Sequence, residues 1–149
     1  MKKLPVRLPD PVVALLVSFA VFLPSAAGVW AHGADWEVRM VGKRVGSYDV
    51  TVRTSPKQPH TGPLHVEVQL IDPKTLAYVE RATVSAAARL RGGTMALAGP
   101  VPSRYVRPWH EMDMMLNKSG SWDVQLAIDG PRERGNVSFR VDILPEDKK

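Results

Sequence analysis

The 149-residue sequence contains no cysteine. Disulfide bonds, thiolate metal ligands, cysteine nucleophiles and lipid attachment at an amino-terminal cysteine are therefore excluded. A domain of this size can be stable without disulfides when its hydrophobic core is large enough. The stability of the fold must then come mainly from the burial of apolar side chains.

The chain also lacks a strong excess of charge of one sign. It has 20 basic and 15 acidic residues, and three of the basic residues, Lys2, Lys3 and Arg7, stand close to the amino terminus. The rest is mildly basic and mixed in sign. A nucleic-acid surface would need denser positive charge with aromatic side chains on one face. We therefore expect no nucleic-acid partner.

Recognisable catalytic motifs are missing as well. No Gly-x-Ser-x-Gly nucleophile elbow occurs, and Gly92-Gly93 is not followed by the Lys-Ser/Thr of a phosphate-binding loop. Glu111 and Asp113 share one face of a predicted strand, where both are expected to be solvated. The sequence therefore predicts a protein that is not an enzyme.

The amino-terminal segment has the three parts of a secretory signal peptide. A basic start precedes the apolar run VVALLVSFAVFL at 12–23, and Pro24 and small residues follow. Cleavage after Ala31 would make 1–31 the signal peptide and His32 the first mature residue. Cleavage after Ala27 is the alternative. The expected location is periplasmic or secreted.

An uncleaved leader would change this location. Residues 12–29 are apolar or small and approach the lower length limit for a membrane span. They would then anchor the protein to the cytoplasmic membrane, and this is the only membrane contact that we expect. The predicted organisation is a leader over 1–31, one domain over 32–144 and a charged tail over 145–149.

Apolar residues beyond the leader recur at every second position, which is typical of half-buried strands. A turn is expected at 41–46, and the alanines of 82–90 also suit a short helix. Residues 91–108, rich in glycine and proline, contain either a short edge strand or a functional loop. The expected strands cover 36–40, 48–52, 64–70, 82–90, 111–116, 122–128 and 137–143.

About seven strands separated by regular turn signals predict an all-β fold, an immunoglobulin-like antiparallel β-sandwich. The last two strands are expected to form a hairpin. Trp122 begins the most hydrophobic strand pair and is the expected anchor of the core.

His32 is the first candidate copper ligand. At a processed amino terminus, its free amine and its imidazole can together chelate Cu(II), and a second histidine would complete the site. Its partner would be His60, His65 or His110, and we favour His110. His65 points outward on its predicted strand, and we expect it to be an exposed strand residue.

The segment WHEMDMM at 109–115 is the second candidate copper site. Its thioethers, Met112, Met114 and Met115, are soft ligands that favour Cu(I), and His110 lies beside them. However, alternation places Met112 and Met114 on one face with Leu116. The competing interpretation is that both methionines fill the core.

The same region also offers a candidate surface for a protein partner. Arg104, Tyr105, Arg107 and Trp109 lie close together in the sequence, and Arg, Tyr and Trp are the residue types that dominate interface energetics. A metal-free interaction module of the cell envelope is therefore the alternative to copper handling.

Several segments carry a family resemblance. GSYDVTV at 46–52 leads into TSP at 54–56, GPLHVEV at 62–68 continues the pattern, and GSWDV at 120–124 precedes VSFRV at 137–141. The mature chain resembles exported β-sandwich proteins of the YtkA-like and FixH-like type. The Met-Pro-x-Met-x-His run common in YtkA-like proteins is absent, and that region holds only Met95.

The resemblance implies an immunoglobulin-like fold outside the cytoplasmic membrane. It also implies an accessory role in copper handling or in assisting a membrane metalloprotein complex. Copper is the one cofactor that it suggests, and an envelope protein or membrane complex is the expected partner.

Overall fold

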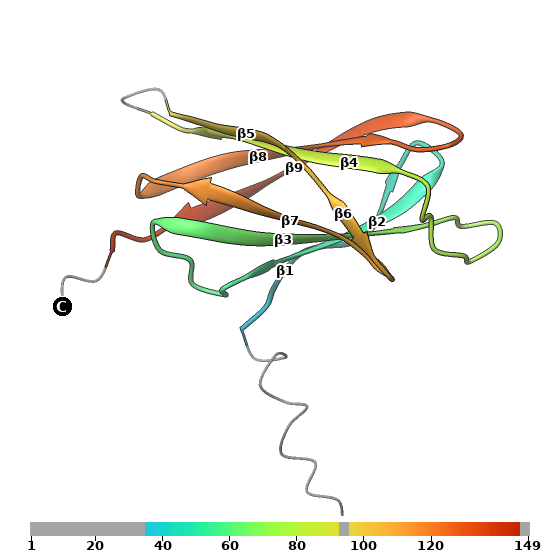
Figure 1. Ribbon diagram of the computed structural model, residues 1–149, viewed down its shortest axis with the longest axis horizontal. Helices are drawn as coiled ribbons and strands as arrows, with labels where there is room; N and C mark the ends of the chain where they lie inside the picture. The colour runs from blue at the N-terminus through green and yellow to red at the C-terminus, as the bar shows by residue number, and fades with distance from the viewer. Residues whose placement is uncertain (1–34, 93–95, 147–149) are drawn as a thin grey trace, which may run out of the picture.

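The computed structural model describes residues 35–92 and 96–146, and the regular structure within them is entirely β (Figure 1). The predicted leader, its alternative cleavage sites and His32 lie outside the described residues. No helix in the described part is long and apolar enough to cross a membrane. The strands are β1 (Glu37–Val45), β2 (Tyr48–Ser55), β3 (Gly62–Ile71), β4 (Thr83–Leu90), β5 (Leu97–Pro102), β6 (Arg104–Val106), β7 (Trp109–Leu116), β8 (Gly120–Asp129) and β9 (Arg134–Ile143).

The strands form two stacked sheets. The five-stranded sheet has the order β1-β2-β3-β7-β6, and the four-stranded sheet has the order β5-β4-β8-β9. Every neighbouring pair is antiparallel. The predicted antiparallel β-sandwich is therefore confirmed, and so is the hairpin of the last two strands.

The predicted turn over residues 41–46 is wrong. Strand β1 continues to Val45, and only Gly46 and Ser47 turn the chain. The pairing of β1 with β2 shifts register between Val38 and Met40 and again between Met40 and Lys43. Such bulges interrupt the alternation of inward and outward side chains. The apolar residues of 41–45 therefore do not alternate regularly with polar ones, although the strand continues through them.

Residues 91–108 contain two strands rather than a long functional loop, which raises the count from about seven to nine. Strand β5 pairs with β4 in one sheet, and β6 pairs with β7 in the other. The chain changes sheets at Ser103, whose N–H donates to the carbonyl oxygen of Val84 at 2.7 Å. Both strands lie at sheet edges, where proline is tolerated. Residues 82–90 form β4 and not a helix.

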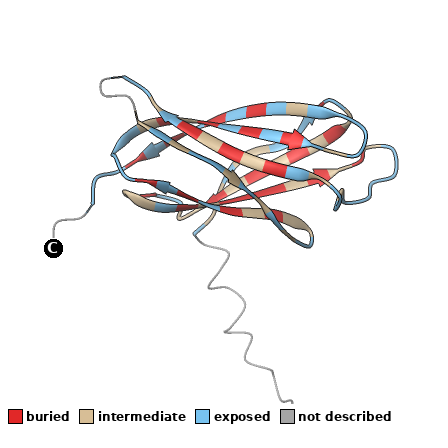
Figure 2. Cartoon of the chain, turned by 45° about the horizontal axis from the view of Figure 1, so that its top comes forward, coloured by how far each residue is buried: buried red, intermediate tan, exposed pale blue. Residues whose placement is uncertain are grey.

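The hydrophobic core lies between the two sheets. Buried positions alternate with exposed or half-buried ones along most strands, as Figure 2 shows. Trp122 is 2% exposed, as expected of the core anchor. Its indole N–H donates to the carbonyl oxygen of Lys118 at 2.9 Å, so the polar end of the ring is satisfied within the fold.

Candidate functional site

The outer face of the five-stranded sheet carries one row of charged side chains across four strands. Arg53 on β2 stands opposite Glu67 on β3, Glu67 stands opposite Glu111 on β7, and Glu111 stands opposite Arg104 on β6. The order of charges across the row is positive, negative, negative, positive. Two carboxylates directly opposite each other repel, and the flanking arginines offset part of this repulsion.

Two tryptophans enclose the arginine at one end of this row. The Arg53 guanidinium carbon lies 4.4 Å from the ring centroid of Trp36 and 4.0 Å from that of Trp109. Both contacts are cation–π interactions. The same guanidinium forms an ion pair with Glu67 through its Nε atom. The arrangement fixes two large aromatic side chains on a sheet face that no other described strand covers.

His65 lies beside this row, in half-buried surroundings rather than as a solvated strand residue. Its Nδ1 lies 2.7 Å from Oδ1 of Asp113, and its Nε2 lies 3.5 Å from Oε1 of Glu67. Its ring also meets that of Trp36 edge to face, with centroids 5.5 Å apart. The side chain thus points outward as expected, but it is half-buried rather than exposed.

His65, Glu67 and Glu111 together form a compact group of metal-ligating atoms. One ligand atom from each lies within 4.8 Å of the other two. Glu67 is 5% exposed, and the side chain of Glu111 is largely covered, unlike that of Asp113. The sequence signal was the period-two spacing of His-x-Glu on β3 and Glu-x-Asp on β7. Only the register of the two strands shows that these patterns meet.

The structure divides the described candidate copper ligands between the two faces of β7. Met112 and Met114 are buried in the core, which confirms the competing interpretation of these two residues, whereas Met115 points to the opposite face and is 55% exposed. His110 faces inward with Met112 and Met114, so it cannot share a surface site with Met115. Whether His32 binds a metal stays a prediction.

His110 is held inside the sandwich by one hydrogen bond. The residue is 1% exposed, and its Nε2–H donates to the carbonyl oxygen of Val79 at 2.9 Å. Its Nδ1 is buried and has no hydrogen-bond partner within the described residues. Burial lowers the pKa of the imidazole below its ordinary value, and the bond to Val79 opposes this shift.

The lowered pKa of His110 predicts a loss of stability in acid. Below about pH 6.5 the unfolded chain binds a proton that the folded imidazole does not take up, so the free energy of unfolding falls. This contribution is constant above that pH. Replacing His110 with glutamine, which retains an N–H donor, should make the melting temperature less dependent on pH between about 7 and 5.5. Identical pH profiles for the two proteins would contradict the assignment.

The predicted partner-binding residues are divided between two faces. Arg104, 80% exposed at its side chain, and Trp109 lie on the outer face. Tyr105 instead turns inward, with its ring 4.8 Å from that of His110 and its hydroxyl buried. Burial raises the pKa of this phenol. Arg107 projects to Glu80, with 3.8 Å between Nη1 and Oε1. Tyr105 is therefore half-buried, with its hydroxyl turned away from the exposed surface.

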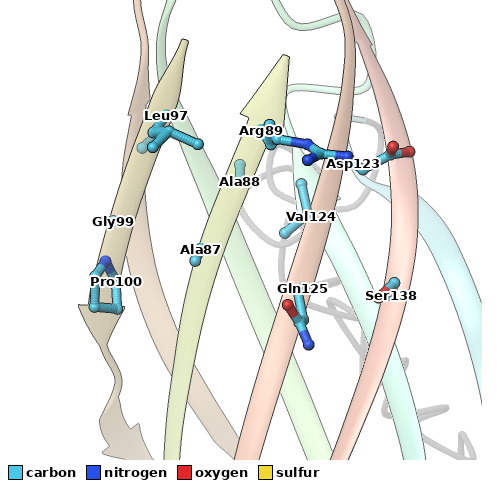
Figure 3. A pocket seen from close by; sticks show the side chains of 11 residues that line it. Ala87, Ala88, Arg89, Leu97, Gly99, Pro100, Asp123, Val124, Gln125 and Ser138 are labelled. Carbon is cyan, nitrogen blue, oxygen red and sulfur yellow. The ribbon is translucent and has the colours of Figure 1, made fainter. Parts of the chain in front are cut away.

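The four-stranded sheet has a hollow on its own outer face, with a volume of about 570 Å³ (Figure 3). Small residues such as Ala87 and Gly99 form much of its lining, and Arg89, Asp123 and Gln125 are its larger polar members. Asp123 pairs with Arg91 and Arg140 at 3.3 and 3.4 Å. The hollow is open and does not converge polar groups on one point, so it is a weaker candidate than the face around Arg53.

Comparisons with known proteins extend this description only slightly. No protein-family model and no curated protein matches the chain. One similar solved structure is that of FetP from uropathogenic E. coli strain F11, which was expressed in the periplasm of E. coli. The TM-score is 0.49 at 9% identity, over 75% of this chain and 98% of that chain. The resemblance to YtkA-like and FixH-like proteins thus stays a prediction, and the β-sandwich rests on the strands described above.

Proposed function

We propose that the protein is an exported accessory protein of the cell envelope that acts by binding a protein partner. The binding surface, here called the tryptophan face, consists of Trp36, Arg53, Arg104, Val106 and Trp109. The observation that carries the proposal is the placement of Arg53 between two indole rings.

This arrangement suits an interface because it is both rigid and rich in anchoring residues. Trp and Arg contribute most to interface hot spots, and side chains already held in place lose less conformational entropy on binding. Val106 is exposed and stands opposite Trp109 across β6 and β7. Arg104 adds an exposed positive charge at the rim.

Export and the absence of catalysis are part of the same proposal. The signal-peptide pattern of residues 1–31 supports export. An accessory role needs a partner rather than a substrate, and no catalytic motif is recognisable in the sequence.

Copper handling and assistance to a membrane metalloprotein complex are the finer forms of this proposal. The sequence resemblance to YtkA-like and FixH-like proteins supports both. His110 and Met115 lie on opposite faces of β7, which argues against a copper site formed by these two residues. Copper binding would therefore need another set of ligands.

Site-specific photo-crosslinking tests the tryptophan face. A photoreactive amino acid at Val106 should yield a cross-linked product of defined mass in the cells that make the protein. The same probe at Ala127, exposed on the outer side of β8 in the other sheet, should yield none. Trp109→Ala should reduce the Val106 product about tenfold or more, as expected of a hot spot. Equal products from both positions, or no product from Val106, would contradict the proposal.

A further inference from the structure

We propose that His65, Glu67 and Glu111 form a binding site for a divalent transition-metal cation, of which Zn²⁺ is the test case. The ligand atoms of the three side chains lie within 4.8 Å of one another. One imidazole nitrogen and two carboxylate oxygens are ligands that Zn²⁺ accepts. This inference is independent of the proposed protein partner.

The hydrogen bond between His65 and Asp113 prepares the histidine for coordination. An acidic side chain that accepts from Nδ1–H fixes the tautomer and leaves the Nε2 lone pair free. The 2.7 Å contact to Asp113 has this form, and Nε2 faces Oε1 of Glu67 at 3.5 Å. Metal-bound histidines in proteins almost always have such an outer partner.

The two carboxylates are positioned in the same way. Glu67 gives one oxygen, Oε2, to Arg53 and keeps Oε1 directed at His65. Glu111 is directly opposite Glu67, and its Oε2 lies 3.5 Å from Nη2 of Arg104. Each proposed ligand therefore has an outer partner, on β2, β6 or β7, that holds its orientation.

A cation at this position would also relieve an electrostatic cost. Glu67 is almost fully buried and faces a second carboxylate across the strands, and like charges at such positions are destabilising. The arginines lie at the two outer ends of the row, whereas the cation would lie between the carboxylates. Three protein ligands leave one coordination position for water or for a group from a partner, as in open zinc sites.

The competing explanation of the contacts between His65 and the carboxylates is that the imidazole carries a second proton instead of binding a metal. A doubly protonated His65 would bridge Asp113 and Glu67 as an ordinary ion pair, without any affinity for Zn²⁺. The two explanations differ in the state of Nε2, which carries a proton in one case and coordinates the cation in the other.

Isothermal titration of the purified protein with Zn²⁺ is the first test. We expect one ion per chain and complete loss of this binding in His65→Ala. Asp113→Asn should weaken it by about 10- to 100-fold, the range found for outer partners of metal ligands, and Glu111→Gln, which removes a charged ligand, should weaken it at least as much. His60→Ala and Glu80→Gln serve as matched controls outside the group and should bind as the wild type does. Zn²⁺ is preferred to Cu²⁺ because a processed His32 terminus would also take up Cu²⁺.

Nitrogen NMR of the histidine rings provides the second test and uses the unmodified protein, so it does not depend on the folding of any variant. On addition of Zn²⁺ the Nε2 resonance of His65 should shift, while its Nδ1–H stays hydrogen-bonded to Asp113. The proposal is overturned if Zn²⁺ does not bind, if the variants bind it as tightly as the wild type, or if His65 keeps protons on both nitrogens. Cross-linking at Val106 is a separate experiment, so failure of the metal site and failure of the protein interface can be distinguished.

Discussion

Replacing Trp122 with alanine is expected to destabilise the folded protein by about 3–5 kcal/mol, the usual cost of removing a buried tryptophan side chain. Trp122 is 2% exposed and packs within the core cluster. The variant loses the transfer free energy of the ring and leaves a cavity between the sheets. It also leaves the carbonyl oxygen of Lys118 without its indole donor.

Chemical denaturation followed by circular dichroism measures this loss directly. Domains of this kind have a total stability of about 5–15 kcal/mol, so the expected loss is a substantial part of the total. Trp36→Ala is the matched control, because Trp36 is only half-buried and lies on the outer face against Arg53. A loss of less than about 1 kcal/mol in Trp122→Ala, or an equal loss in the control, would show that Trp122 does not anchor the core.

Two neighbouring methionines should respond in opposite ways to the same substitution. Met114→Ala is expected to cost about 2–5 kcal/mol, because its side chain is fully buried between the sheets. Met115→Ala should change the stability by no more than about 0.5 kcal/mol, since Met115 is exposed on the opposite face.

The same pair of variants tests the sequence-based copper hypothesis. Titration with Cu(I) under reductant should give the same affinity for Met115→Ala and the wild type if Met115 is not a ligand. A marked loss of Cu(I) binding in Met115→Ala without a loss of stability would instead show that Met115 is a Cu(I) ligand, together with residues other than the buried His110. A small stability change in Met114→Ala would contradict its place in the core.

Much of the fold was predictable because a half-buried strand shows alternating apolar and polar residues in its local sequence. Alternation identified β3, from Leu64 to Leu70, and the hairpin of β8 and β9, and it correctly placed Met112 and Met114 inside. This alternation is lost where the strand geometry is irregular. The bulges of β1 interrupt the alternation of its apolar residues, so its full length was not predicted. The prolines of β5 led to the prediction of a loop where the structure has an edge strand.

The candidate site was much less predictable, because it depends on the register of strands that are distant in the sequence. Arg53, Glu67, Glu111 and Arg104 form one row only because β2, β3, β7 and β6 pair as they do. A shift of one residue in any pair would turn the side chains of one strand to the other face. Alternation showed that His65 and Glu67 share the outward face of β3, but it could not show that Asp113 and Glu111 of β7 lie next to them.

The irregular strands at the sheet margins bear on how other molecules can approach the protein. The backbone hydrogen-bonding groups of β1 are interrupted by its bulges, β5 contains Pro100 and Pro102, which lack an N–H, and β6 has only three residues. These three margins are poor templates for the addition of a foreign strand, whereas β9, the fourth edge strand, pairs regularly along its ten residues from Arg134 to Ile143. Recognition through the backbone of a sheet edge would therefore have to use β9, and at the other three edges it depends on the side chains that the sheets display.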